Sequence, residues 1–151
     1  MPALADPDFA ARVRESFARQ GAMRTLGATL AHVGPGHVVV AMSHQDALTQ
    51  QHGFVHAGML TTALDSACGY AAFSLMPADA AVLTIEFKMN LLAPARGPHF
   101  RFEGRVAKAG RTISVVDGRA LQTATPEAAD GELIATMTAT VMTVVGRGIK
   151  H

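Results

Sequence analysis

Residues 54–78 read FVHAGMLTTALDSACGYAAFSLMPA, and Asp65 is the only charged residue among them. Leucine and alanine recur at helical spacing, at Leu60, Leu64 and Ala67, and small or apolar residues occupy most of the other helical faces. A helix that is apolar on nearly all sides is buried inside a protein rather than laid on its surface. The stretch therefore predicts one long central helix.

The length of this stretch would also allow a membrane span. An ionised carboxylate in the middle of a bilayer costs about 3 kcal/mol or more. Asp65, together with Gly58 and Gly69, therefore favours a helix inside a protein core, and we expect no membrane association.

The segments around the central helix predict an α+β domain. Asp6-Pro7 is a favourable helix start, Phe9, Val13 and Phe17 form an apolar stripe, and Gly21 is a plausible helix end. Turns containing Gly, Pro or Asp separate strand-like segments, which make an antiparallel sheet wrapped around the helix. These segments are 25–33, 37–42, 81–92, 99–108, 112–123 and 132–145.

The chain has 151 residues, enough for one domain with a substantial core. We expect residues 1–22 to form a short N-terminal helix packed on the domain, residues 23–146 to form the domain itself, and residues 147–151 to be a frayed tail. One sheet that covers one helix leaves a face open, and only 17% of the residues are charged. Both features predict a homo-oligomer.

The composition indicates which class of partner to expect and in which cellular compartment the protein resides. The formal net charge is +1, so there is no overall basic excess for nucleic acid. A single cysteine, Cys68, fits a reducing compartment, and the N-terminus has no secretory signal pattern. We expect a cytoplasmic protein.

Asp65 is the first candidate for chemistry. A buried carboxylate costs free energy unless it is paired, hydrogen-bonded or protonated. It could be structural and accept hydrogen bonds from Thr61, Thr62 or Ser66, which are at helical spacing. It could equally be a general base or nucleophile, because burial raises the pKa of a carboxyl group toward neutrality.

The start of the helix, His56-Ala57-Gly58, offers free backbone N–H groups to an anion or a developing oxyanion. His56 by itself is more often a structural hydrogen-bonding residue than a catalytic base. His44, His52 and His56 are close in sequence, but their spacing matches no zinc pattern. We expect neither a metal nor another cofactor.

Residues 96–119 hold a local excess of basic side chains, with only Glu103 and Asp117 opposing them. Such a patch on a nearly neutral protein suits a phosphorylated small molecule. The basic residues are Arg96, Arg101, Arg105, Lys108, Arg111 and Arg119.

Residues 50–58, QQHGFVHAG, followed by Leu60 and Asp65, resemble the PaaI-type acyl-CoA thioesterases of the hotdog-fold superfamily. The segments 84–87 (TIEF), 92–95 (LAPA) and 108–112 (KAGRT) strengthen the resemblance, which spans residues 21–145. The chain departs from the family pattern twice, with His-Ala-Gly in place of His-Gly-Gly and with Gln50 in place of an asparagine.

This resemblance implies a hotdog fold and hydrolysis of an acyl- or aryl-CoA thioester to the free acid and CoA. Asp65 takes the position of the catalytic carboxylate, as general base or nucleophile, and the N–H of Ala57 that of the oxyanion-hole donor. Gln50 occupies the position of the family's asparagine, which helps to orient the thioester carbonyl or the attacking water. Thr84 occupies the position where some members have a hydroxyl that binds this water. The substrate-binding positions are His56, Gly58, Arg96, Lys108, Gly110 and Arg111.

Helix geometry adds a constraint to these roles. Ala57 and Asp65 are eight residues apart, about 12 Å along a helix, so both cannot touch one carbonyl within a single chain. The mechanism therefore requires two antiparallel protomers, and the resemblance implies a tetramer. Two alternatives stay open, an acyl-CoA-binding hotdog protein without turnover and a hotdog hydratase or dehydratase.

Overall fold

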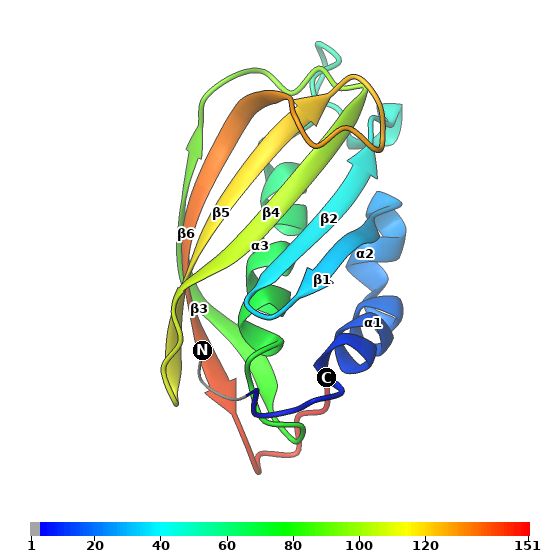
Figure 1. Ribbon diagram of the computed structural model, residues 1–151. Helices are drawn as coiled ribbons and strands as arrows, with labels where there is room; N and C mark the ends of the chain where they lie inside the picture. The colour runs from blue at the N-terminus through cyan, green and yellow to red at the C-terminus, as the bar shows by residue number, and fades with distance from the viewer. Residues whose placement is uncertain (1–3) are drawn as a thin grey trace.

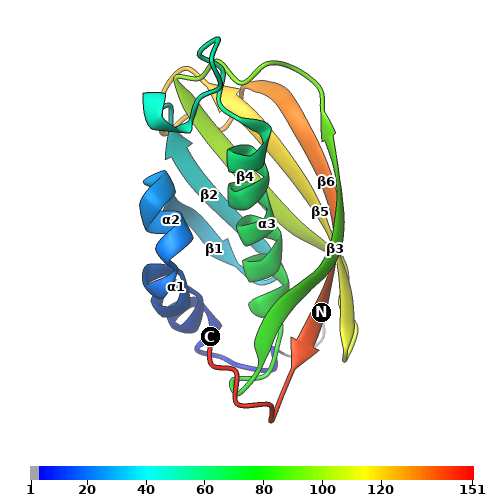
Figure 2. The same cartoon turned by 180° about the vertical axis from the view of Figure 1, so that it is seen from behind.

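Helix α3 (Ala57–Phe73) lies along the concave face of a six-stranded antiparallel sheet. The computed structural model describes residues 4–151. Figures 1 and 2 show the sheet curving around α3, with α1 (Phe9–Arg19) and α2 (Gly21–Leu26) on one side of that helix and β3 on the other. The strand order is β1-β2-β4-β5-β6-β3. The strands are β1 (Thr29–Gly34), β2 (His37–Ser43), β3 (Ala81–Leu91), β4 (His99–Lys108), β5 (Ile113–Thr123) and β6 (Glu132–Val144), and a 3-10 turn spans Asp46–Leu48.

The central helix is buried, as its sequence predicts, although it is shorter than residues 54–78. The His56 side chain caps its N-terminus, and from Leu60 onward almost every side chain except Thr61, Thr62 and Asp65 is buried. Pro77, which cannot continue a helix, follows the C-terminus. Across residues 4–151, the structure has no helix of the length and apolarity that a membrane crossing requires.

Two facing glycines let α3 approach the sheet closely. Gly104 of β4 and Gly118 of β5 are register partners beneath the helix. A Cβ added to Gly104 would lie 2.5 Å from the carbonyl oxygen of Ala67, and one added to Gly118 would lie 2.8 Å from the Sγ of Cys68. These positions therefore fix the depth at which α3 sits in the sheet.

The N-terminal region corrects two expectations from the sequence. The helix begins at Phe9 rather than at Asp6-Pro7, and Gly21 opens α2 instead of ending the helical region. Residues 25 and 26 are helical rather than strand, because Gly27 ends α2 with φ = 65°. The N–H of Gly27 donates to the Arg24 carbonyl and the N–H of Ala28 to that of Met23, which completes a glycine C-cap.

Arg12 ties α1 to the C-terminal end of α3. Its guanidinium donates to the carbonyl oxygens of Phe73 (3.2 Å) and Met76 (2.9 Å), and it lies 4.1 Å from the centre of the Phe73 ring. Asp6 accepts a 2.7 Å hydrogen bond from the Arg12 Nε, and this bond holds the pKa of the Asp6 carboxyl below its usual range. Asp6 thus orients the Arg12 side chain that connects α1 to α3, instead of starting a helix.

The edge strand β3 is exposed on both of its faces between residues 83 and 88. Leu83, Ile85 and Phe87 are 44%, 54% and 45% exposed, large values for apolar side chains on one strand. Because an open apolar edge is a ready template for pairing with another chain, β3 is a surface suited to an interface.

The close approach at Gly104 yields a stability prediction. Gly104→Ala places a methyl group against the α3 backbone, which cannot move aside, so we expect the free energy of unfolding to fall by about 3 kcal/mol. Gly69→Ala is the matched control, because a Cβ at Gly69 has no neighbour within 4 Å. The free energy of unfolding of Gly69→Ala should equal that of wild type or exceed it by up to about 1 kcal/mol. Urea unfolding of both variants checks this, and equal effects would contradict the account.

Candidate functional site

Asp65 is half-buried on α3, and its carboxylate accepts a 2.8 Å hydrogen bond from the Thr84 hydroxyl of β3. Burial raises the pKa of Asp65 above its ordinary value, and the bond from Thr84 opposes that rise. The local hydroxyls do not reach this carboxylate. Thr61 and Thr62 donate to backbone carbonyls one turn earlier, and Ser66 donates to the Gln20 side chain. Asp65 therefore takes its side-chain hydrogen bond from another element of the fold rather than from its own helix.

A β-bulge in β3 aims Thr84 at the helix. The pairing of β3 with β6 shifts between Thr84 and Glu86, so that Ile85 is an extra residue. After the bulge Glu86 accepts a bond from Thr140 of β6, while Phe87 joins Asp65 in lining a cavity. The bulge thus places Thr84 and Phe87 on the same side of the strand as Asp65.

Two cavities border Asp65. One of about 330 Å³ lies between α3 and β3 and includes Thr84, Gly69 and Tyr70 in its lining. The other, of about 300 Å³, is lined by Thr61, Phe87 and other residues. Asp65 consequently faces space large enough for a water molecule and part of a substrate.

The start of α3 forms a second group of candidate residues. The His56 Nδ1 accepts a 2.8 Å bond from the Gly58 N–H, so His56 is a structural cap and the Gly58 donor is engaged. The Ala57 N–H has no hydrogen-bond partner within residues 4–151. Ala57 and Gln50 line one cavity of about 360 Å³. A free N–H at a helix N-terminus beside a cavity is suited to stabilise an oxyanion.

The two groups are separate within one chain. The cavity of Ala57 and Gln50 shares no lining residue with either cavity of Asp65. Ala57 is the first residue of α3, and Asp65 lies eight residues further along it, about 12 Å away. Within one chain, the structure thus places Asp65 beside Thr84 and places Ala57 and Gln50 in one cavity, but the two pairs do not share a site.

The three nearby histidines have separate partners. His44 bonds to the carbonyl of Gly53 (3.0 Å), His52 packs on the Phe54 ring with centroids 4.7 Å apart, and His56 caps α3. In the part of the chain that the structure describes, no three His, Cys, Asp or Glu side chains gather as metal ligands would.

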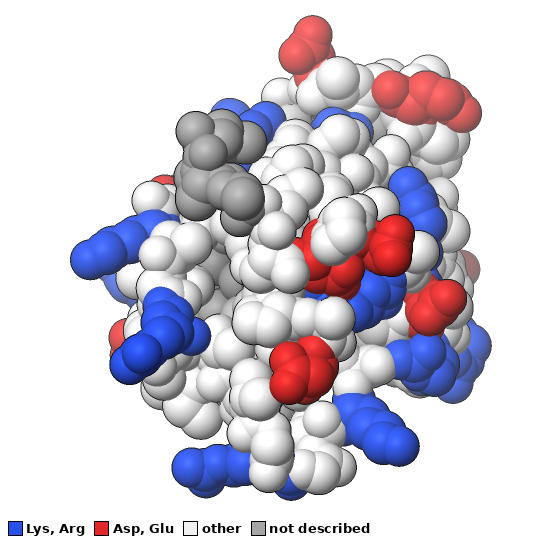
Figure 3. Space-filling view, turned by 60° about the horizontal axis from the view of Figure 1, so that its bottom comes forward, with Lys and Arg blue, Asp and Glu red and all other residues white. Residues whose placement is uncertain are grey.

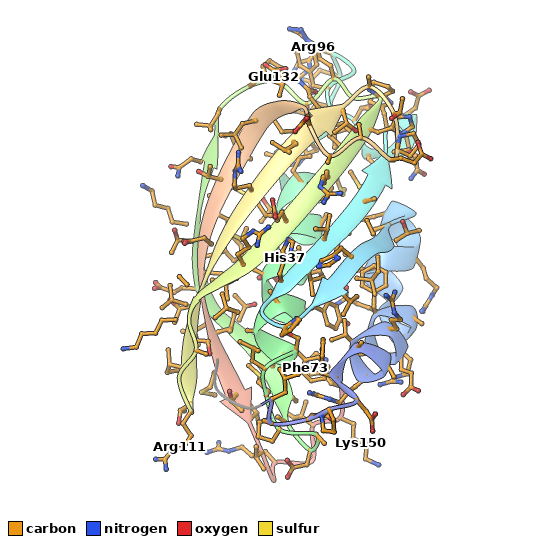
Figure 4. The ribbon with its side chains drawn as sticks, viewed as in Figure 1. His37, Phe73, Arg96, Arg111, Glu132 and Lys150 are labelled. Carbon is orange, nitrogen blue, oxygen red and sulfur yellow. The ribbon has the colours of Figure 1, made fainter. Side chains whose placement is uncertain are left out.

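The candidate cationic residues lie at opposite ends of the sheet. Figure 4 shows Arg96 at one end, where its guanidinium lies 5.2 Å from the centre of the Phe54 ring, and Arg111 at the other. Lys108 and Gly110 belong to the same β4–β5 turn as Arg111. Figure 3 views the Arg111 end, where basic and acidic side chains are interspersed. Arg96 and the Lys108–Arg111 turn therefore do not converge on one patch within the chain.

Sequence reasoning missed three polar residues that line the larger Asp65 cavity, which are Gln20, Tyr70 and His151. Ser66, which the sequence offers as a hydrogen-bond partner of Asp65, also lines this cavity. Gln20 comes from the junction between α1 and α2, and His151 from the segment expected to fray, so neither carries a local sequence signal. Tyr70 follows Asp65 by five residues on the same apolar helix, and its sequence context does not distinguish cavity lining from core.

Comparison with known proteins identifies the family. The thioesterase superfamily matches residues 52–129. A Halobacterium salinarum protein named "Putative esterase" is 30% identical over 118 residues, which cover 74% of this chain and 78% of that protein. The chain belongs to the thioesterase superfamily. A protein of the same name from Saccharolobus solfataricus is 34% identical over 82 residues, 54% of this chain and 58% of that relative's length.

Solved structures of superfamily proteins show the same fold. A thioesterase family protein from Silicibacter pomeroyi is 53% identical, with a TM-score of 0.87 over 91% of this chain and 99% of that one. The PaaI protein of the Escherichia coli phenylacetic acid degradation operon is 17% identical, with a TM-score of 0.81 over 92% and 95% of the two chains. The hotdog fold expected from the sequence is confirmed.

The raised pKa of Asp65 predicts a pH-dependent stability difference. An unfolded aspartate titrates near pH 3.9, so between that pH and the higher folded pKa the folded protein holds the extra proton. Wild-type stability therefore falls as pH rises through this window. Asp65→Asn, which stays neutral and can still accept the Thr84 bond, should be more stable than wild type at pH 7. Urea unfolding at fixed protein concentration should show this gain shrinking toward pH 3; a pH-independent difference would contradict the assignment.

Proposed function

We propose that the protein is an acyl-CoA thioesterase, which hydrolyses an acyl- or aryl-CoA thioester to the free acid and CoA. The observation that carries the proposal is the Asp65 carboxylate, held by Thr84 beside a cavity on a helix with no other charged side chain. A protein that only bound the ligand would gain little from a half-buried carboxylate whose pKa burial raises. Membership of the thioesterase superfamily supports the same chemistry.

The proposed catalytic unit is an antiparallel dimer. The exposed apolar residues of β3, Leu83, Ile85 and Phe87, supply a surface for a second copy of the chain. A two-fold axis through this edge reverses the partner's helix. Ala57 and Gln50 of one protomer then face Asp65 and Thr84 of the other, so that the two halves make one site.

Hydrolysis in this composite site begins with attack of water on the thioester carbonyl carbon. Asp65, as general base, takes the water proton while the C–O bond forms, and the Thr84 hydroxyl orients the carboxylate. The Ala57 N–H stabilises the oxyanion of the tetrahedral intermediate. The C–S bond then breaks, the proton passes to the thiolate, and the acid and CoA leave. As nucleophile, Asp65 would instead form an anhydride that water hydrolyses, and both routes need the ionised carboxylate.

The same dimer would gather cationic residues around the CoA nucleotide. Ala95, the neighbour of Arg96, lines the same cavity as Ala57, and Figure 4 shows Arg111 at the opposite end of the sheet from Arg96. Reversal of the partner brings its Lys108–Arg111 turn to the end that holds Arg96. Two such dimers would form the tetramer that the sequence leads us to expect.

The proposal is tested by thiol release from phenylacetyl-, benzoyl- and hexanoyl-CoA. Asp65→Asn should lower kcat by about 10²- to 10⁴-fold, because the general base is lost. Ala57→Pro should lower kcat by about 10²- to 10³-fold, because the oxyanion donor is lost. Proline is well tolerated at the first helical position, and the extended conformation of His56 is one that a residue before proline adopts.

Two matched variants control for nonspecific damage. Asp117→Asn removes an exposed carboxylate from β5, on the face of the sheet opposite to Gly118 and α3, and Ala57→Gly keeps the N–H. Both should retain turnover near that of wild type. Saturable binding of CoA esters without any thiol release would favour the binding-protein alternative. Loss of an enoyl absorbance without thiol release would favour the hydratase alternative.

A further inference from the structure

His151 is held in a chain of hydrogen bonds between three elements. Its Nε2 lies 2.9 Å from the Val82 carbonyl of β3, which can only accept, so Nε2 carries the proton. Its Nδ1 lies 3.0 Å from the Ser16 hydroxyl of α1, and that hydroxyl lies 3.0 Å from the Tyr70 hydroxyl of α3, so both pairs are hydrogen-bonded. Each polar atom of the chain has a partner, so the ring is fixed in position.

Packing reinforces these bonds. The His151 ring lies on Phe73, with centroids 4.7 Å apart, and meets Tyr70 edge-on at 6.2 Å. Arg19 of α1 donates to the His151 carbonyl oxygen. The segment after β6 thus crosses to α1 and docks there, as Figure 2 shows, although its sequence predicts a frayed tail.

The docked ring forms part of the wall of the larger Asp65 cavity. Asp65 and Thr84 line this cavity together with Gly69, Tyr70, Val82 and His151. Asp65 and Tyr70 are five residues apart, about 7.5 Å along α3. The lining of the cavity therefore runs from the carboxylate to the Tyr70–His151 contact, where the hydrogen-bonded chain forms its wall.

The size of this cavity indicates the class of acyl group. An apolar cavity of about 150 Å³ holds a benzene ring, and this one is about 330 Å³. A ring with a short linker, or a short to medium straight chain, would fit between Asp65 and His151. A longer straight chain directed along α3 from Asp65 would meet the His151 ring, which is part of the cavity wall.

We propose that His151 is a specificity-determining residue that closes the acyl pocket and limits the protein to compact acyl groups. The inference rests on the proposed function, because the cavity is an acyl pocket only if Asp65 faces the thioester. It adds a role for a segment outside the sheet and helix that carry the candidate catalytic residues.

Chain-length profiles test the proposal, using hexanoyl-, octanoyl-, decanoyl- and dodecanoyl-CoA with phenylacetyl-CoA as the compact reference. His151→Ala removes the ring, so the kcat/KM ratio of dodecanoyl- to hexanoyl-CoA should rise at least about 10-fold, as expected for apolar groups that gain a pocket. Lys150→Ala is the matched control, because Lys150 is an exposed neighbour on the same segment and points away from the domain in Figure 4. It should keep the wild-type profile.

A second variant changes the same cavity in the opposite direction. A Cβ at Gly69 meets no atom within 4 Å, so Gly69→Ala adds a methyl group to the cavity without disturbing the fold. It should lower the ratio of decanoyl- to hexanoyl-CoA. If His151→Ala does not fold, as judged by thermal unfolding, the Gly69→Ala profile decides the test.

Binding separates this inference from the proposed function. The same series is titrated calorimetrically against Asp65→Asn, with and without His151→Ala, so that no turnover is needed. A shift of the length limit in binding supports the inference even if wild type releases no thiol, in which case the proposed hydrolysis alone fails. An unchanged length profile in both turnover and binding, for His151→Ala or for its Gly69→Ala substitute, would overturn the inference.

Discussion

The close contact between α3 and the pair Gly104 and Gly118 is the constraint on which the rest of the structure depends. No side chain other than hydrogen fits at Gly104, where a Cβ would lie 2.5 Å from the backbone of Ala67. This contact sets the depth of α3 against β4 and β5. With the helix at that depth, Asp65 lies within 2.8 Å of Thr84 on β3. A helix lifted by a methyl group would carry the carboxylate away from its partner.

A straight helix in this position also divides the site. Ala57 and Asp65 are held about 12 Å apart on one helix. The Ala57 N–H and the Asp65 carboxylate of a single chain therefore cannot contact the same thioester carbonyl. The dimer that we propose, with a second copy of the chain in the reverse direction, accounts for both the exposed apolar edge of β3 and the divided site. The half-buried state of Asp65 follows from the same arrangement, because its cavity lies against the strand that a partner would cover. The proposed composite site and the proposed dimer thus both follow from the position of one helix.

Much of this could be predicted from the sequence, for identifiable reasons. The apolar character of residues 54–78 and the turn at Gly34-Pro35-Gly36 are local signals, and the buried helix and the β1–β2 hairpin follow from them. The boundary errors also have local causes. The sequence pattern predicts a strand at residues 25 and 26, although they complete the helix that Gly27 ends. The position of Asp65 in the helix was accessible, but its bond to Thr84 depends on the bulge at Ile85, which no local pattern encodes. The contributions of Gln20 and His151 arise from tertiary packing alone.

The composite site is the central claim, and mixing two inactive variants tests it most directly. Asp65→Asn and Ala57→Pro are unfolded together, refolded as a mixture and assayed for thiol release. Random pairing gives heterodimers in half of the dimers, each with one of its two sites intact, so activity should recover to about a quarter of wild type. Each variant refolded alone should stay inactive. No recovery in a mixture whose heterodimers are shown by native mass spectrometry would contradict a site shared between protomers.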